Sequence, residues 1–362
     1  MRKVLYVPLD DRDCNYQFPW LLSQMTEGLE LLRPPYEWMG FLKKPANREK
    51  IWEWLFEQAG ECDYAILSVD TLVYGNIIGS RIHTYSMEEC RETMDRFRQL
   101  KKQNPQLHIH AFNLAARVAA YNDNHEDPEY WQEYGYDIWR YTWLWDKKKR
   151  AEISEKEAEE LESLQKKIPE EIMQDFLERR KTDRFVNLTS VELVRENVFD
   201  ILTVPKDDTA EFGYAALDQM AIMQKAEGEQ LMDRVYCYPG ADEVGSVIFA
   251  RVFCQIKQYQ PVFYVRYSSL TGSSVIPLYE DRPLGERALS GRSCQLEESV
   301  RKPLRMQTVC WQSTRREPVR SNRQTRKTDE ILLRIMQRIR KSCCAISGII
   351  RNITESLSGS AM

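Results

Sequence analysis

The sequence of 362 residues has no long hydrophobic run and no regular cysteine pattern. No apolar stretch reaches the length of a membrane-spanning helix, and Met1 leads directly into a short strand-like run rather than a signal peptide. The nine cysteines are irregularly spaced and include no C-x-x-C pair. We therefore expect the reduced thiols of a cytoplasmic protein rather than a disulfide framework or a zinc site.

Several motifs of common enzyme classes are also absent. The chain has no G-x-G-x-x-G or G-x-x-x-x-G-K-[ST] loop for nucleotide phosphates, no H-E-x-x-H zinc motif and no G-x-S-x-G nucleophile turn. These absences argue against a dinucleotide-dependent dehydrogenase, a P-loop NTPase, a zinc protease and an α/β-hydrolase.

Charge is divided unevenly along the chain. Residues 287–362 carry 16 Lys and Arg against 6 Asp and Glu, whereas residues 1–286 carry 35 against 49. We therefore predict a domain over 1–286 and a separate basic, Arg-rich tail over 287–362. Because the tail has no strand–helix rhythm, we favour out-of-frame translation after Glu286, which would leave it disordered. The alternative is a basic arm in which Asp329–Lys341 forms an amphipathic helix for a membrane or a nucleic acid.

Short strand-like runs alternate with helical stretches over residues 1–286, the pattern of a largely parallel sheet. The expected strands are Val4–Leu9, Leu29–Leu32, Tyr64–Val69, Leu107–Phe112, Asp200–Val204, Arg234–Tyr238 and Pro261–Val265. The expected helices are Ile51–Gln58, Met87–Lys102, Gly213–Lys225 and Glu243–Ile256. We expect an α/β fold of parallel β/α repeats closed into a barrel-like sheet, with a doubly wound open sheet as the alternative.

An insertion over about 128–183 interrupts this alternation. It begins with a dense aromatic patch between Tyr130 and Trp145 and continues as a charged helix that Pro169 breaks. Packing of the inserted helices is the favoured role of the aromatic rings, with stacking on sugar rings as the alternative.

Acidic residues follow most of the expected strands. Because parallel strands end at one edge of a sheet, their carboxylates would gather there. Such a group suits hydrolysis of a glycosidic bond, and it suits a hard cation such as Mg²⁺ or Ca²⁺ equally well. We predict no cofactor, with a divalent cation as the alternative. The predicted catalytic residues are Asp207, Asp208, Asp242 and Glu243.

A second set of polar residues at the same edge is predicted to bind substrate. This set comprises Asp10, Asp11, Arg12, Asn15, Asp70, Asn76 and Arg117. Structural interpretations compete with binding: a salt bridge is favoured for Arg12 and Arg117, and also for Arg81, while a turn is the alternative for Asn76 and Asn113 and helix capping is the alternative for the acids. Asp208 and Glu211, for example, have the spacing of a capping box, and Asp242 precedes an expected helix.

Five segments carry a specific resemblance. They are VPLDDRDCN (Val7–Asn15), LSVDTLVYGN (Leu67–Asn76), FNLAAR (Phe112–Arg117), KDDTAEFG (Lys206–Gly213) and YPGADEVG (Tyr238–Gly245). In this order they resemble the bacterial family catalogued as domain of unknown function 4127, over roughly residues 1–286. The resemblance implies a cytosolic bacterial protein and supplies no activity. The matched positions are Asp10, Asp11, Arg12, Asn15, Asp70, Asp207, Asp208, Asp242 and Glu243.

The functional prediction is hydrolysis of a carbohydrate or a similar small polyhydroxylated substrate. A metal-dependent hydrolase or lyase that uses the same acids is the first alternative, and a non-catalytic sugar-binding or scaffold protein is the second. We expect no specific nucleic-acid partner and no membrane partner, and the sequence leaves the oligomeric state open.

Overall fold

The computed structural model describes residues 1–207, 210–259, 271–276 and 283. Its sheet consists of β1 (Arg2–Val7), β2 (Leu29–Leu32), β3 (Tyr64–Ser68), β4 (His108–Phe112), β5 (Ile201–Lys206) and β6 (Val235–Pro239). Neighbouring strands pair in the order β2-β1-β3-β4-β5-β6, and every pairing is parallel. Within the described residues the sheet is open, because β2 and β6 lie at its two edges.

The predicted α/β class with a parallel sheet is confirmed, and the open alternative replaces the expected barrel. After β1 the chain adds β2 on one side, and it then returns to add β3 on the other side. Later strands extend the sheet away from β2, so the two ends of the sheet do not meet. The strand expected at Pro261–Val265, the boundary at residue 286 and the basic tail lie outside the described residues.

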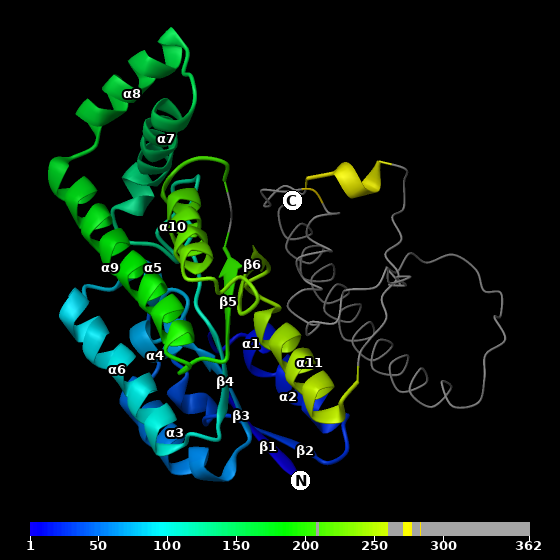
Figure 1. The fold of residues 1–362 in the computed structure, drawn as a ribbon. Helices are drawn as coiled ribbons and strands as arrows, with labels where there is room; N and C mark the ends of the chain where they lie inside the picture. Colours follow the sequence, from blue (N-terminus) through cyan, green and yellow to red (C-terminus); the bar gives the residue numbers. More distant parts are fainter. Residues whose placement is uncertain (208–209, 260–270, 277–282, 284–362) are drawn as a thin grey trace, which may run out of the picture. The chain divides into compact units, whose positions relative to one another are not determined.

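Helices cover both faces of the sheet, as Figure 1 shows. The α-helices are α1 (Asp13–Tyr16), α2 (Phe18–Gln24), α3 (Arg48–Gln58), α4 (Val69–Tyr74), α5 (Gly79–Ile82), α6 (Met87–Gln103), α7 (Trp131–Arg150), α8 (Glu155–Lys167), α9 (Glu170–Arg195), α10 (Tyr214–Gly228) and α11 (Val244–Lys257). Three short 3₁₀ helices are η1 (Tyr36–Trp38), η2 (Ala59–Glu61) and η3 (Gly272–Ser274). None of the helices in the described part of the chain has both the length and the apolar character needed to cross a bilayer.

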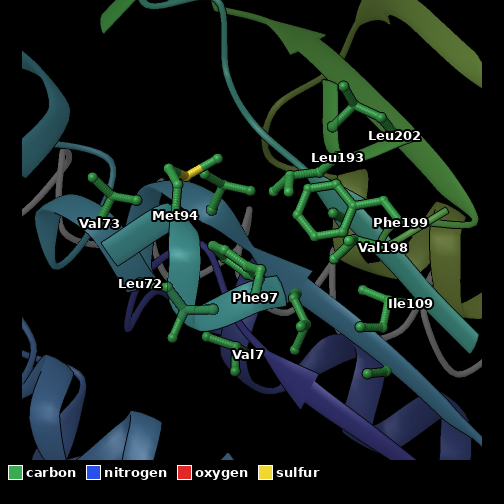
Figure 2. Packing of buried hydrophobic residues seen from close by; sticks show 14 of the residues in the cluster. Val7, Leu72, Val73, Met94, Phe97, Ile109, Leu193, Val198, Phe199 and Leu202 are labelled. Atoms are coloured by element: carbon green, nitrogen blue, oxygen red, sulfur yellow. The ribbon is translucent and has the colours of Figure 1, made fainter. Parts of the chain in front are cut away.

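Residues 4–7 of strand β1 are apolar on both faces of the sheet. Leu5 and Val7 pack into the core on the face covered by α3, α6 and α9, and Val4 and Tyr6 pack into the core under α2 and α11. A strand buried on both faces has no polar alternation. In the larger core Phe97 of α6 meets Phe199 edge to face, with ring centroids 5.1 Å apart (Figure 2).

The insertion forms α7, α8 and the first half of α9. Its aromatic residues pack α7 against α9 and α10: the ring centroids of Trp131 and Phe176 lie 6.0 Å apart, and Trp145 stacks on Tyr214 of α10 with centroids 5.7 Å apart. Ser154 begins α8 with a capping box, and Pro169 separates α8 from α9 as expected. The second half of α9 extends past residue 183 and packs against the sheet.

Candidate functional site

The order of the strands places a topological switch point between β1 and β3, at the loops that follow these two strands. In doubly wound sheets, ligands bind at the carboxyl edge where neighbouring strands connect in opposite directions, and here that point lies between β1 and β3. The Thr71 hydroxyl of α4 donates to the carbonyls of Pro8 and Leu9 at 2.7 and 2.8 Å, which fixes one loop against the other. Predicted site residues lie on both loops.

Arg12 is the centre of the first group of polar residues. Its Nε donates to Asp10 at 2.8 Å, and its Nη2 lies 2.8 Å from carboxylate oxygens of both Asp10 and Asp242. Asn15 donates to the second oxygen of Asp10 at 2.9 Å, and its own carbonyl accepts from the Tyr6 hydroxyl. Residues that follow β1 and a residue that follows β6 therefore meet at one point.

This arrangement depends on the path of α11, which returns across the sheet from β6 to α1 and α2. A side chain at Gly245, in its first turn, would collide with the Tyr6 hydroxyl at 2.2 Å, so the close approach requires glycine. Gly240 has φ +126°, and an added Cβ would lie 2.6 Å from Oε1 of Glu243. The loop after β6 is thus shaped to hold Asp242 and Glu243 at the strand edge.

The Arg12 group remains accessible to solvent. The side chain of Arg12 is 45% exposed, that of Asp242 is 59% exposed, and Glu243 is also exposed. Partial burial lowers the pKa of Arg12, but the hydrogen bond and charge of Asp10, together with the charge of Asp242, outweigh burial and raise the pKa overall. Arg12 is therefore a permanently charged donor with part of its guanidinium facing solvent.

Asp11 lies beside this group and points elsewhere. Its carboxylate accepts from the Tyr36 hydroxyl at 3.4 Å. Burial is the largest influence on the Asp11 carboxyl and raises its pKa. A carboxyl with a raised pKa at a strand edge suits the donation of a proton.

Two arginines and three carboxylates form a second group beyond β4 and β5. Arg81 donates to Asp207 at 2.7 Å and to Glu126 at 2.9 Å, and Arg117 donates to Glu126 at 3.2 Å and to Asp127 at 3.0 Å. Burial raises the pKa of Glu126, but the charges of Arg81 and Arg117 outweigh it and lower the pKa overall. The charge of Arg12 acts in the same direction, so the two groups lie within electrostatic reach of each other.

Asp70 is enclosed by protein. It is 1% exposed, and its two oxygens accept from Asn113 Nδ2 at 3.2 Å and from the backbone N–H of Leu114 at 2.9 Å. Asn113 accepts in turn from Asn187 at 2.7 Å and from Ser190 at 3.2 Å. Burial raises the pKa of Asp70 to about 7 despite these hydrogen bonds. The side chain joins the loops after β3 and β4 and faces the interior.

Asn76 is likewise occupied by backbone groups. Its Nδ2 donates to the carbonyls of Leu42 at 2.9 Å and Lys44 at 3.3 Å, and its Oδ1 accepts from the N–H of Gly79 at 2.6 Å. The structure brings Asp10, Arg12, Asn15 and Asp242 together and does not bring Asn76 to them. Asp208 lies outside the described residues.

Among the described acids at this edge, helix capping does not account for Asp70 or Asp242. Ser68 caps α4, Gly213 precedes α10, and Asp242 binds Arg12 rather than the first turn of α11. Glu126 and Asp127 are not among the predicted site residues, although the acidic run before α7 is visible in the sequence, and a salt bridge is the favoured interpretation of Arg81. The expected ring of carboxylates is instead an alternation of carboxylates and arginines.

No group of three or more Asp, Glu, His or Cys side chains in the described part of the chain is arranged to hold a metal ion. The arginines occupy the positions between the carboxylates that a cation would take. The residues present at the described part of this edge therefore do not fit a metal centre.

Comparison with known proteins identifies the family. A family model described as protein of unknown function, DUF4127, matches residues 4–351. The chain belongs to this family. Each of the five segments on which the resemblance rests begins in the last residues of a strand, namely β1, β3, β4, β5 or β6. In this DUF4127 protein the family-like segments therefore line one edge of one sheet.

The matched range extends past Glu286 into the basic, Arg-rich segment. An altered reading frame after Glu286 stays a prediction, and sequencing the gene in all three frames tests it. Searches of curated proteins and of solved structures returned no match.

Proposed function

We propose that this DUF4127 protein hydrolyses a small polyhydroxylated substrate, such as a glycoside, at the carboxyl edge of the sheet. One observation carries the proposal: Arg12, held between Asp10 and Asp242, remains 45% exposed at the point where doubly wound sheets bind ligands. A fixed guanidinium with a free face suits a hydroxyl or another polar substituent of a substrate.

In this proposal Asp207 or Asp208 acts together with Asp242 or Glu243. One carboxyl protonates the leaving oxygen, and the other carboxylate attacks the sugar or activates the water that completes the cleavage. Asp242 and Glu243 are exposed, and Asp207 is held by Arg81 at 2.7 Å. Asp10, Asn15 and Asp70 serve as positioning residues because their side chains bind protein groups. Asp11, Arg12 and Arg117 are proposed to orient the substrate.

The test is a screen of the full-length chain against 4-nitrophenyl glycosides and oligosaccharides, with release of nitrophenol or reducing sugar as the readout. Asp207→Asn and Asp242→Asn are compared with Asp233→Asn, an exposed residue that precedes β6 at the opposite edge. We expect the first two variants to lose at least about a hundredfold in rate and the third to match the parent chain.

Two alternatives give different results when ligand binding is measured alongside the screen. Activity that a chelator abolishes and Mg²⁺ or Mn²⁺ restores would indicate a metal-dependent hydrolase or lyase. Saturable binding without turnover would indicate a sugar-binding or scaffold protein. Absence of both activity and binding across the screen contradicts the proposal.

We also propose a cytoplasmic location. The cysteines in the described residues, which are Cys14, Cys62, Cys90, Cys237 and Cys254, are all free thiols. Free thiols are typical of reducing compartments. Fractionation of the source cells with an antibody to the protein tests the location.

A further inference from the structure

A cavity of about 380 Å³ opens between α9 and the segment that precedes α7. The loop after β2, the short helix α5 and Pro128–Tyr130 form three of its walls. The fourth wall is one face of α9, on which Glu171, Asp175 and Arg179 follow at four-residue spacing. The volume falls within the range of small-molecule sites.

The inner wall carries a fixed polar network. Arg179 donates to Asp175 at 2.7 Å, to the Tyr130 hydroxyl at 3.0 Å and to the carbonyl of His83 at 2.9 Å. The Tyr130 hydroxyl donates to Asp175 at 2.8 Å, which closes a triangle of hydrogen bonds. Because Arg179 is 8% exposed and held by three partners, the wall is ordered before any ligand binds.

The outer rim adds charges of both signs. Lys43 forms an ion pair with Glu129. The Glu171 carboxylate has no hydrogen bond or ion pair within the described part of the chain. Apolar surface lies between these polar groups and comes from Ile82, Pro128 and Ile172.

We propose that this cavity binds a neutral polyhydroxylated ligand. A vicinal diol both donates and accepts hydrogen bonds, so it pairs with a neighbouring carboxylate and cation such as Asp175 and Arg179 or Glu129 and Lys43. An anion would face three carboxylates, and a wholly apolar ligand would desolvate the charges. The apolar surface complements the C–H face of a sugar or cyclitol.

The cavity is separate from the strand-edge site. A smaller cavity of about 20 Å³ shares Pro128 and Arg179 with it and extends to Arg81 and Arg117. This volume holds about one water molecule, so a ligand in the large cavity does not reach the Arg81–Asp207 ion pair. The inference therefore concerns an additional site and does not rest on the proposed hydrolysis.

Saturation-transfer NMR with the full-length chain tests the inference. The probes are methyl α-glucopyranoside and myo-inositol as neutral polyols, choline as a cation and citrate as an anion. We expect saturable binding of at least one polyol, with a Kd at least about tenfold higher in Glu171→Ala. Glu170→Ala is the matched control, because both residues are exposed in the first turn of α9 and only Glu171 lines the cavity. Ile172→Trp, which fills the cavity, should abolish binding.

Several results would overturn the inference. These are binding of choline or citrate without polyols, no saturable binding of any probe, and equal polyol affinity in the parent chain and Ile172→Trp. Circular dichroism confirms that each variant is folded before its affinity is compared. Asp207→Asn and Asp242→Asn should leave this binding unchanged, and loss of polyol binding in them instead would assign the polyol to the strand edge.

Discussion

Asp70 gives the protein a specific dependence of stability on pH. The carboxyl is buried, and its pKa is raised from 3.8 to about 7. Between these values the folded chain holds a proton at this site that the unfolded chain has released. The stability that Asp70 contributes is therefore fully present below about pH 4 and is lost as pH rises to about 7. The total change corresponds to about 4 kcal/mol.

The variant Asp70→Asn isolates this effect, because an amide cannot titrate. The mutation carries a constant cost, because the amide oxygen can accept from only one of the two donors, Asn113 Nδ2 and the Leu114 N–H, and the new NH₂ group would face the other. A constant cost does not alter the pH dependence. We expect the free energy of unfolding of the parent chain, minus that of the variant, to fall by about 4 kcal/mol between pH 4 and pH 8.

Urea unfolding of both full-length proteins at five pH values, followed by tryptophan fluorescence, measures the difference. The difference in free energy of unfolding between the two proteins should change most steeply between about pH 4 and pH 7, by about 1.4 kcal/mol per pH unit. A difference that is the same at pH 4 and pH 8 would refute the assignment of a raised pKa to Asp70.

Three further predictions concern packing and local geometry. Phe97→Ala should lower the free energy of unfolding by about 3–5 kcal/mol in urea titrations, because the ring is fully buried and its removal leaves a cavity. Gly75→Ala should lower the free energy of unfolding by more than about 1 kcal/mol, because φ at Gly75 is +101° and the new Cβ would lie 2.4 Å from the Cβ of Pro45. Gly228→Ala is the control: Gly228 has open space around it at the end of α10, and the variant should be neutral or stabilising. Thermal melts compare the two variants. Ser86→Ala should cost about 1 kcal/mol through loss of the capping box of α6, and an unchanged midpoint of unfolding would contradict that role.

The strands were predictable because their burial on both faces leaves a strong signal. Tyr64–Val69 and Leu107–Phe112 are short apolar runs between turn residues, and both form strands with ends within two residues of those expected. Such runs do not determine the order of the strands in the sheet. A barrel and an open sheet share the same β/α alternation, and only the pairing of β2 with β1, away from β6, decides between them.

The position of the site was predictable and its electrostatics were not. Parallel strands end at one edge, which brings Asp10 and Asp242 together although they are far apart in sequence. The pairing of Asp242 and Glu126 with arginines depends on the return of α11 to β1 and on the path of the loop that carries Glu126. Both depend on tertiary contacts, which leave no periodic pattern in the sequence. Asp70 was predicted to bind substrate, but its side chain is buried and binds Asn113 and the Leu114 N–H.

The central claim is that Arg12, bridged by Asp10 and Asp242, forms part of a hydrolytic site. The most direct test is the rate of glycoside or oligosaccharide hydrolysis by Arg12→Lys, which keeps the positive charge and cannot bind both carboxylates with one planar group. We predict a rate at least about tenfold below that of the parent chain, with Asp233→Asn unchanged. Equal rates of hydrolysis in the parent chain and in Arg12→Lys, Asp207→Asn and Asp242→Asn would contradict the claim.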